Sequence, residues 1–283
     1  MPAVGPDPAG SNRVGYQGEP GAYSDEAAHA LFPQARTEGF ASFATTFAAL
    51  DSGQVEVGVL PAENSLAGAV QEVSDLLWRH RSLRVSGEHL ARIEHLLLGR
   101  LEAGRVRRAL SHPQALAQCA AWLEERAITP VPVSDTALAA RQVAAEGRPG
   151  DAAIASAAAA ARYRLEVLAR DIADRAFNQT RFLVVRRGAA AAEGLSGPAK
   201  LALGLTAAHR PGGLLAVLEV FARQGANLTR LDSRPIPDSP FHYRFYADGE
   251  LDRGEDLVGL LEQLRAVTGE LVLFGAYPLG SAA

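Results

Sequence analysis

Residues 55–80 read "VEVGVLPAENSLAGAVQEVSDLLWRH", and this stretch decides the fold class. Its first seven residues form a short apolar run rich in valine, which favours a buried strand. From Asn64 to His80 the apolar residues recur at helical spacing, which predicts a helix. A strand followed directly by a helix is the repeating unit of an α/β fold.

The same alternation continues on both sides of this stretch. The strand-like segments "RVGYQG", "RRALS", "ITPVPVS" and "AAIAS" each precede a helical segment between Arg13 and Arg187. We therefore predict one α/β domain over residues 13–187. Residues 188–199, "GAAAAEGLSGPA", are small and nearly uncharged, which is typical of a linker.

The pattern changes after the linker. Over residues 200–277 the expected order is strand, helix, strand, strand, helix, strand, which is the α+β ferredoxin-like unit βαββαβ. A small domain of this kind exposes a sheet edge, and an open edge favours pairing with a second copy of the chain. The sequence thus predicts two domains of different architecture.

Composition excludes several classes of protein. Hydrophobic residues make up 48% and charged residues 21%, the net charge is −4, and no basic cluster suggests a nucleic-acid partner. Cys119 is the single cysteine, so no intrachain disulfide and no cysteine zinc site can form. The only lysine is Lys200, which leaves the first domain without a Schiff-base lysine.

The first residues lack the basic and apolar segments of a signal peptide. The apolar stretch over residues 152–161 is too short to cross a bilayer. We expect a cytoplasmic protein that does not contact a membrane.

Polar residues gather at three predicted junctions between a strand and a helix. "GYQGEPGAYS" contains Ser24, "PAENSLAG" contains Glu63 and Asn64, and "SHPQALAQC" contains Ser111 and Gln118. The glycine spacing is not G-x-G-x-x-G, which argues against a dinucleotide site. Helix N-termini attract anions, and in an open α/β sheet they gather at the carboxyl edge of the strands.

Each junction also has a purely structural explanation. The serine and asparagine side chains are common N-caps, and Ser111 with Gln114 fits a capping box. However, Thr180 and Arg181 add a hydroxyl and a fixed cation at the start of the apolar run "FLVV". Together these residues predict a small anionic ligand that carries hydroxyl or carboxylate groups.

Five segments resemble a known family. "GYQGEPGAYSDEAA", "PAENSLAGAV", "SHPQALAQC" and "NQTRF" resemble the signature segments of prephenate dehydratase, in the same order. "RPGGLL" followed by "NLTRLDSRP" resembles the ACT regulatory domain found behind it. The resemblance covers residues 13–277. No chorismate mutase segment precedes the first motif, so the resemblance is to the monofunctional type.

The resemblance implies an architecture as well as an activity. The catalytic domain should be two α/β lobes separated by a cleft, like a periplasmic solute-binding protein. The lobes are expected at residues 13–87 plus 165–187 and at residues 88–164, with the chain crossing near Glu88 and Leu165.

The implied reaction converts prephenate to phenylpyruvate, carbon dioxide and water, without a metal or a cofactor. By matching the motifs, the implied catalytic residues are Thr180, Glu63, Asn64, Ser111 and Gln118. Thr180 would donate a hydrogen bond to the departing hydroxyl or position the acid that protonates it. Glu63 is the candidate acid if burial raises its pKa, and the alternative is a structural carboxylate.

Substrate-binding roles are implied for Arg181, Asn178 and Ser24. Arg181 would hold a substrate carboxylate bidentately or, equally, form an ion pair that supports the site. His112 is expected to pack rather than to act in catalysis. The other six histidines show no metal-ligand spacing.

The ACT resemblance implies that L-phenylalanine binds between paired domains and inhibits the enzyme. The implied effector residues are Gly212, Gly213, Leu214, Asn227, Leu228, Asp232, Ser233, Arg234 and Pro235. Gly213 and Asp232 depart from the commonest family pattern, which puts the strength and the sign of regulation in doubt. A homodimer through this domain is expected, or a tetramer, and a domain that only dimerises is the alternative.

Two other functions fit the same residues. Arogenate dehydratase acts on the aminated form of the substrate and would use similar groups. A non-catalytic amino-acid sensor would keep the frame without the reaction. Turnover of each substrate separates these alternatives.

Overall fold

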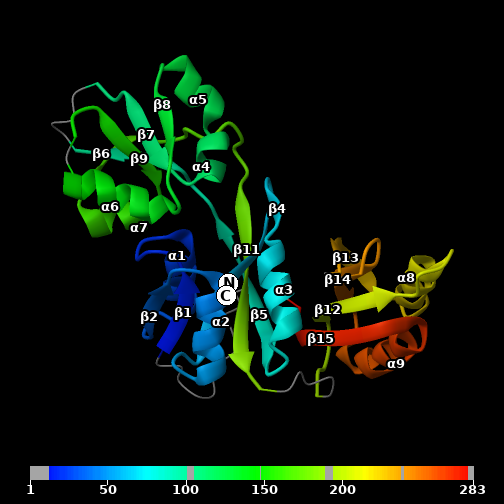
Figure 1. Cartoon of the computed structure of the whole chain (residues 1–283). Helices are drawn as coiled ribbons and strands as arrows, with labels where there is room; N and C mark the ends of the chain where they lie inside the picture. The colour runs from blue at the N-terminus through cyan, green and yellow to red at the C-terminus, as the bar shows by residue number, and fades with distance from the viewer. Residues whose placement is uncertain (1–12, 101–104, 147, 189–193, 237–238, 280–283) are drawn as a thin grey trace.

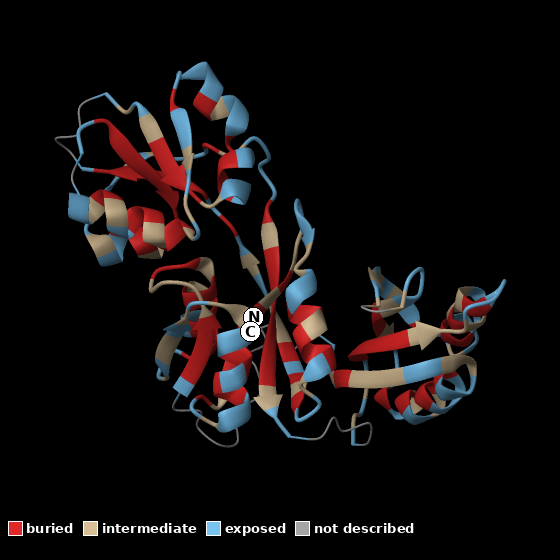
Figure 2. Ribbon diagram, in the orientation of Figure 1, coloured by how far each residue is buried: buried red, intermediate tan, exposed pale blue. Residues whose placement is uncertain are grey.

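A computed structural model describes residues 13–100, 105–146, 148–188, 194–236 and 239–279. Three β-sheets with their helices form two lobes and a C-terminal domain (Figure 1). Inner strands such as β6, β9, β11 and β12 are mostly buried, whereas the edge strands β2, β8 and β13 and the outer faces of the helices are partly or fully exposed (Figure 2). The expected two-lobed α/β domain followed by a ferredoxin-like domain is confirmed.

The first lobe is built on a sheet with the strand order β2-β1-β3-β11-β5, and β4 pairs with β3. The first three strands are parallel, whereas β11 runs antiparallel to both of its neighbours. Its elements are β1 (Arg13–Gln17), α1 (Tyr23–Leu31), β2 (Arg36–Phe40), α2 (Phe43–Ser52), β3 (Val57–Asn64), β4 (Gly68–Ala69), α3 (Gln71–Arg79), β5 (Leu83–Arg92) and β11 (Gln179–Arg187).

The second lobe is a five-stranded sheet with the order β10-β6-β9-β7-β8. All five residues of β9 are buried, which agrees with its apolar sequence "DAAIA" and with a central place in the sheet. Its elements are β6 (Leu96–Gly99), β7 (Arg108–Ser111), α4 (Pro113–Ala117), α5 (Ala120–Glu125), β8 (Thr129–Pro132), α6 (Thr136–Glu146), β9 (Asp151–Ala155), α7 (Ala157–Tyr163) and β10 (Glu166–Ala169).

The chain crosses between the lobes later than predicted. Glu88 lies inside β5, which pairs with β11 from Leu83 to Arg92, so the first crossover follows at residues 93–95. Leu165 precedes β10, which pairs with β6 in the second lobe, so the return lies at residues 170–178. Strand pairing therefore moves both boundaries toward the C-terminus.

The helix expected from Asn64 begins at Gln71 instead. β3 continues to Asn64 and turns back through β4, forming a hairpin. The Oδ1 atom of Asn64 accepts hydrogen bonds from the backbone N–H groups of Leu66 and Ala67, at 3.1 and 3.0 Å. This Asx turn offers the backbone an alternative to the helix, so Asn64 closes a hairpin rather than capping a helix.

The C-terminal domain has the strand order β13-β14-β12-β15, and its helices give the predicted sequence βαββαβ. Its first strand begins one residue before the predicted boundary, and residues 189–193 of the expected linker lie outside the described residues. Its elements are β12 (Ala199–Ala207), α8 (Gly213–Arg223), β13 (Asn227–Pro235), β14 (Tyr243–Leu251), η2 (Gly254–Asp256), α9 (Leu257–Val267) and β15 (Thr268–Pro278).

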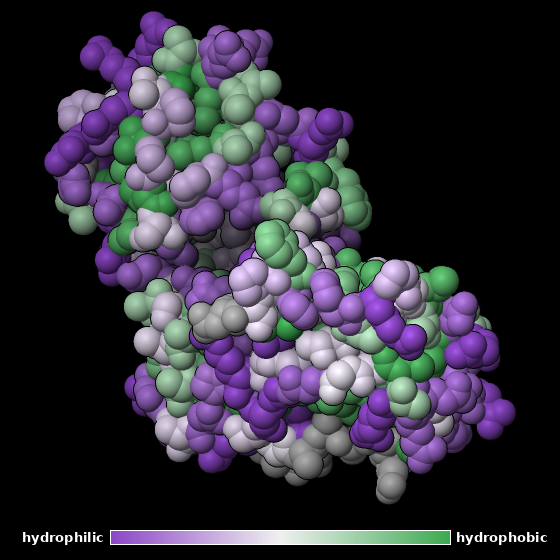
Figure 3. Space-filling view, turned by 45° about the vertical axis from the view of Figure 1, so that its right-hand side comes forward, coloured by the Kyte–Doolittle hydropathy of each residue, from purple (hydrophilic) through white to green (hydrophobic). Residues whose placement is uncertain are grey.

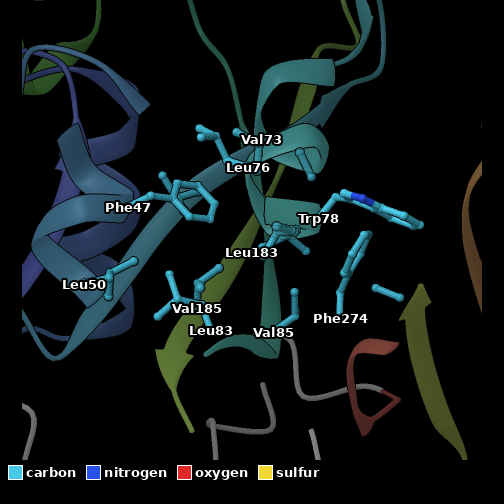
Figure 4. Packing of buried hydrophobic residues seen from close by; sticks show 14 of the residues in the cluster. Phe47, Leu50, Val73, Leu76, Trp78, Leu83, Val85, Leu183, Val185 and Phe274 are labelled. Carbon is cyan, nitrogen blue, oxygen red and sulfur yellow. The ribbon is translucent and has the colours of Figure 1, made fainter. Parts of the chain in front are cut away.

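The C-terminal domain shares a hydrophobic core with the first lobe. Trp78 of α3 and Val85 of β5 lie in the same buried cluster as Phe274 of the C-terminal sheet (Figure 4). Tyr246 of that sheet belongs to the same cluster. At Gly275 an added Cβ would lie 2.0 Å from the carbonyl oxygen of Val85, so β15 approaches β5 as closely as only glycine permits. The sheet face that carries no helices therefore covers the first lobe.

Candidate active site

A cleft of about 590 Å³ lies between the two lobes. The space-filling view shows a recessed region between the second lobe, at the top, and the rest of the molecule (Figure 3). Asn64, Thr180 and Ser24 line the cleft from the first lobe, and Gln118 lines it from the second. The predicted motifs thus meet at one place although they are far apart in the sequence.

Three amide side chains form a hydrogen-bonded group at the base of the cleft. Asn64 Nδ2 donates to Asn178 Oδ1 at 2.7 Å, and Asn178 Nδ2 donates to Gln118 Oε1 at 3.0 Å. Gln118 Nε2 in turn lies 3.4 Å from Asn64 Oδ1. Asn178 is only 3% exposed, so it supports the other two amides from behind rather than lining the cleft. The group joins both lobes and the returning crossover.

Thr180 ends this hydrogen-bonded group. Its Oγ1 atom accepts a hydrogen bond from Asn64 Nδ2 at 3.0 Å, and the side chain faces the cleft. The backbone contacts of Asn64 Oδ1 fix which end of that amide carries the hydrogens. Because Thr180 accepts from the amide, its own hydroxyl hydrogen remains to donate into the cleft.

Tyr23 and His95 extend the polar wall of the cleft, and the sequence interpretation missed both. His95 is 3% exposed and is hydrogen bonded to the Tyr23 hydroxyl and to Gln118. Burial lowers the pKa of His95, and the bond to Gln118 opposes that shift. Burial also raises the pKa of Tyr23 well above its ordinary value. "RIEHLLLG" carries no spacing signal, so only the crossover geometry could identify this histidine.

The lowered pKa of His95 predicts that stability falls at low pH. The unfolded side chain titrates near pH 6.5, and the folded side chain below that. The unfolded state therefore binds the proton first, and stability is lost as the pH falls from about 6.5 toward the folded pKa. Urea unfolding between about pH 7.5 and 5.5, about one unit either side of that value, should show this dependence of the unfolding free energy on pH.

The unfolding free energy should depend less steeply on pH in the His95→Gln variant. The matched exchange at the exposed His209, His209→Gln, should keep the wild-type dependence. Equal slopes in wild type and His95→Gln would contradict this assignment.

Arg181 points away from the cleft. Successive strand residues face opposite sides of a sheet, so Thr180 faces the cleft and Arg181 faces the C-terminal domain. Its guanidinium lies 2.5 Å from Asp248, 3.1 Å from Glu88 and 3.6 Å from Glu63. Burial lowers the pKa of Arg181, but the carboxylates of Asp248 and Glu88 outweigh it and raise the pKa. The structure favours the ion-pair alternative over the expected carboxylate clamp.

Glu63 and Ser111 also lie outside the cleft lining. Glu63 is partly exposed on the same side of the sheet as Arg181, which removes the burial that an acid role required. Ser111 is fully buried, and its hydroxyl donates to the carbonyl oxygen of Ile154 at 2.6 Å. The expected capping box is absent at this site, because His112 Nδ1 accepts from the backbone N–H of Gln114 and caps α4.

The cleft is poor in positive charge. Among the described residues that line it there is no lysine or arginine, whereas Glu72 and Asp135 contribute carboxylates. Burial raises the pKa of Asp135, and hydrogen bonds from the N–H groups of Leu138 and Ala137 oppose that shift. Asp135 is the N-terminal cap of α6. A carboxylate ligand would therefore depend on neutral donors such as Ser24, Gln118, Thr180 and backbone amides.

The predicted effector residues lie on two faces of the C-terminal domain. Leu214 lines a second cavity of about 620 Å³ beside the helix start at Gly212 and Gly213. An added Cβ at Gly213 would lie 2.0 Å from the carbonyl oxygen of Ala208, so the missing methyl makes room for a close approach. Arg234 lies on the opposite side, where it bonds to Asp75 of α3 at 2.7 Å.

The remaining effector candidates lie along β13. Asp232 accepts from Arg230 Nε at 2.6 Å, and Asn227 Nδ2 lies 3.5 Å from Glu250. Leu228 packs against the domain core, while Ser233 and Pro235 are exposed.

In the described part of the chain, no group of three or more histidine, cysteine, aspartate or glutamate side chains is arranged to hold a metal ion. Nor is any helix there long and apolar enough to cross a membrane.

Residues 14–190 match the family model of prephenate dehydratase. The chain belongs to the prephenate dehydratase family. It is therefore a lyase-type enzyme with a two-lobed dehydratase domain.

Relatives match nearly the whole chain. Arogenate dehydratase/prephenate dehydratase 2 of Arabidopsis thaliana is 37% identical over 94% of this chain and 73% of its own length. A bifunctional N-acyl-homoserine lactone acylase/prephenate dehydratase of Komagataeibacter europaeus is 36% identical over 95% of this chain and 96% of its own length. The solved structure of prephenate dehydratase from Arthrobacter aurescens with L-Phe has a TM-score of 0.84 and 28% identity, covering 96% and 91%.

Proposed function

We propose that this chain converts prephenate to phenylpyruvate, carbon dioxide and water in the formation of phenylalanine. One observation carries the proposal: Thr180 is held by Asn64 so that its hydroxyl hydrogen can donate into the cleft between the lobes. In this proposal the departing hydroxyl of the substrate accepts a hydrogen bond from that donor. The membership of the family supports the same reaction.

The reaction needs few protein groups. The bond to the ring carboxylate breaks, and its electron pair makes the ring aromatic. The bond to the ring hydroxyl breaks, and the hydroxyl takes up one proton and leaves as water. Prephenate dianion and one proton thus give phenylpyruvate, carbon dioxide and water. The protein has to orient the dianion and stabilise the leaving hydroxyl.

Thr180 is the donor to that hydroxyl in this proposal. A threonine hydroxyl is a poor acid, so it positions the leaving group while the proton comes from another donor. Gln118 and Ser24 lie within the same cleft as donors to a carboxylate.

We further propose that the C-terminal domain is an ACT domain that senses L-phenylalanine and pairs with a second copy. The Arthrobacter relative, solved with L-Phe, supports the effector. The exposed apolar side chains of Leu215, Leu231 and Tyr243 would be covered by pairing. The oligomeric state, a dimer or a tetramer, and the cytoplasmic location remain predictions from the sequence.

Helix α3 supplies a physical route for that control. Val70 and Glu72, at its start, line the cleft, while Asp75 accepts from Arg234 and from the Tyr246 hydroxyl of the C-terminal sheet. An effector that moves β13 would therefore move α3. Inhibition also requires that the effector bind one state of the cleft better than another.

Turnover of prephenate and of arogenate, each with and without L-phenylalanine, tests the proposed function. Phenylpyruvate formed from prephenate and suppressed by L-phenylalanine would support both domains' roles. Activity on arogenate alone would favour the aminated substrate, which the carboxylates of Glu72 and Asp135 would suit. Binding of L-phenylalanine with no turnover of either substrate would favour the sensor.

Asp75→Asn should weaken inhibition without weakening effector binding. The exchange removes the charge that holds Arg234 to α3 but leaves both cavities intact. We expect about a fivefold or larger rise in the L-phenylalanine concentration for half inhibition, the lower end of typical coupling energies. Calorimetric affinity for L-phenylalanine should stay near wild type.

The matched control is Asp256→Asn, because Asp256 forms an exposed pair with Arg253 and should change neither property. Unchanged inhibition of Asp75→Asn would remove α3 from the route.

A further inference from the structure

His95 occupies a buried position between the two lobes. It lies in the crossover that joins β5 to β6. Its Nδ1 atom is 2.8 Å from the Tyr23 hydroxyl, and its Nε2 atom is 2.7 Å from Oε1 of Gln118. The rings of His95 and Tyr23 meet edge-on with centroids 5.7 Å apart. Because both ring nitrogens are engaged, the imidazole has one orientation and can impose one on its partners.

The bond to Gln118 has a definite direction. An amide oxygen can only accept, so Nε2 of His95 carries the hydrogen. The same oxygen also accepts from Asn178. Two donors on the oxygen turn the amide nitrogen of Gln118 to the other side, where one hydrogen is directed at Asn64 Oδ1. The second hydrogen remains for the cleft, which Gln118 lines.

We propose that His95 is a positioning residue that makes Gln118 present an N–H donor, and not its carbonyl oxygen, to a carboxylate of the bound substrate. This role rests on the proposed dehydratase function. The cleft lining, as far as the structure describes it, offers no cationic lysine or arginine, so each neutral donor matters for an anion. Without His95 the Gln118 oxygen loses one of its two donors, and only Asn178 and the long 3.4 Å bond to Asn64 still hold the amide with its nitrogen toward the carboxylate.

The role does not need proton transfer by His95. The Tyr23 hydroxyl can donate to Nδ1 of the neutral ring or to the carbonyl oxygen of Glu94, which lies 2.8 Å away. Nε2 therefore keeps its hydrogen in either protonation state of the ring. Burial favours the neutral form, which further separates this role from that of a general acid.

Three exchanges at His95 separate positioning from packing. Glutamine places an amide nitrogen near the position of Nε2, whereas asparagine places one near Nδ1, and phenylalanine places none. We expect His95→Gln to stay near wild type, and His95→Asn and His95→Phe to lower kcat/KM by about 10- to 100-fold, the usual cost of a lost bond to a charged group. The idea is overturned if asparagine restores activity as well as glutamine does.

A double-mutant cycle with Gln118→Ala tests the mechanism itself. If His95 acts only through Gln118, His95→Phe should cost nothing further once Gln118 is alanine. If the double variant loses kcat/KM by the product of the two single losses, His95 acts independently of Gln118 and the proposal is contradicted. Calorimetric affinities for prephenate should rank the variants in the same order. A wild-type chain without turnover would contradict the proposed function, whereas that ranking would still test the role of His95.

Discussion

Replacing Thr180 by valine should lower kcat for prephenate by about 100- to 1,000-fold, the usual cost of removing one preorganised donor from a transition state. The exchange keeps the shape of the side chain and removes only the hydroxyl. Thr180 is 8% exposed and its oxygen is held by Asn64, so the donor is fixed before the substrate binds. The hydrogen bond from this hydroxyl should strengthen as negative charge develops on the leaving oxygen in the transition state. The substitution should therefore lower kcat more than it raises KM.

Steady-state kinetics of Thr180→Val, Thr180→Ser and Thr129→Val would check this expectation. Serine keeps the hydroxyl and should retain most of the activity. Thr129 is an exposed threonine of β8, so Thr129→Val makes the same chemical change away from the cleft and should leave kcat unaltered. The affinity for L-phenylalanine should be equal in the wild type and the three variants. A Thr180→Val enzyme with wild-type kcat would remove this hydroxyl from the mechanism.

Local sequence patterns sufficed for the fold class. The valine-rich run of β3 and the apolar "DAAIA" of β9 are buried on both faces. Such strands can be recognised in a sequence as short continuous apolar runs. The lobe boundaries were harder to predict from the sequence. β5 and β11 pair over their whole lengths, and that pairing involves residues about a hundred positions apart. No local pattern near Glu88 encodes such a partner.

The site was predictable only in part, for a related reason. Asn64, Gln118 and Thr180 sit in recognisable motifs and meet in the cleft. Glu63 and Arg181 belong to the same motifs but face the other side of the sheet, because neighbouring strand residues alternate. His95 had no motif, and its place follows from the crossover alone.

The alternation along β11 gives one strand two tasks. Thr180 faces the cleft, whereas Arg181 reaches the C-terminal domain through Asp248 of β14. The surrounding network contains further charges: Lys200 bonds to Glu88 at 2.9 Å, and Arg230 lies 3.3 Å from Asp248. The Tyr277 hydroxyl donates to Glu88 at 3.0 Å. The buried polar interface between the domains thus begins one residue from the proposed catalytic hydroxyl.

Asp248→Asn should be the most destabilising single exchange in this interface. The Asp248 carboxylate is shared by Arg181 and Arg230, and its side chain is only 4% exposed. Asparagine keeps the shape but removes the charge, which leaves two buried cations with less compensation. Removal of one partner from a buried ion pair typically costs about 3–5 kcal/mol, because the remaining charge stays desolvated.

Urea unfolding of the Asp248→Asn and Glu219→Gln variants compares the loss of unfolding free energy at Asp248 with that of the same kind of substitution at an exposed ion pair. Glu219 pairs with Arg223 on the exposed face of α8 at 3.4 Å, and such surface pairs contribute about 0–1 kcal/mol. A loss of about 3–5 kcal/mol of unfolding free energy in Asp248→Asn, without such a loss in Glu219→Gln, would establish that a buried charge binds the C-terminal domain to β11. Equal losses in the two variants would mean that water screens the interface, and that Arg181 can be held by Glu88 and Glu63 without the second domain.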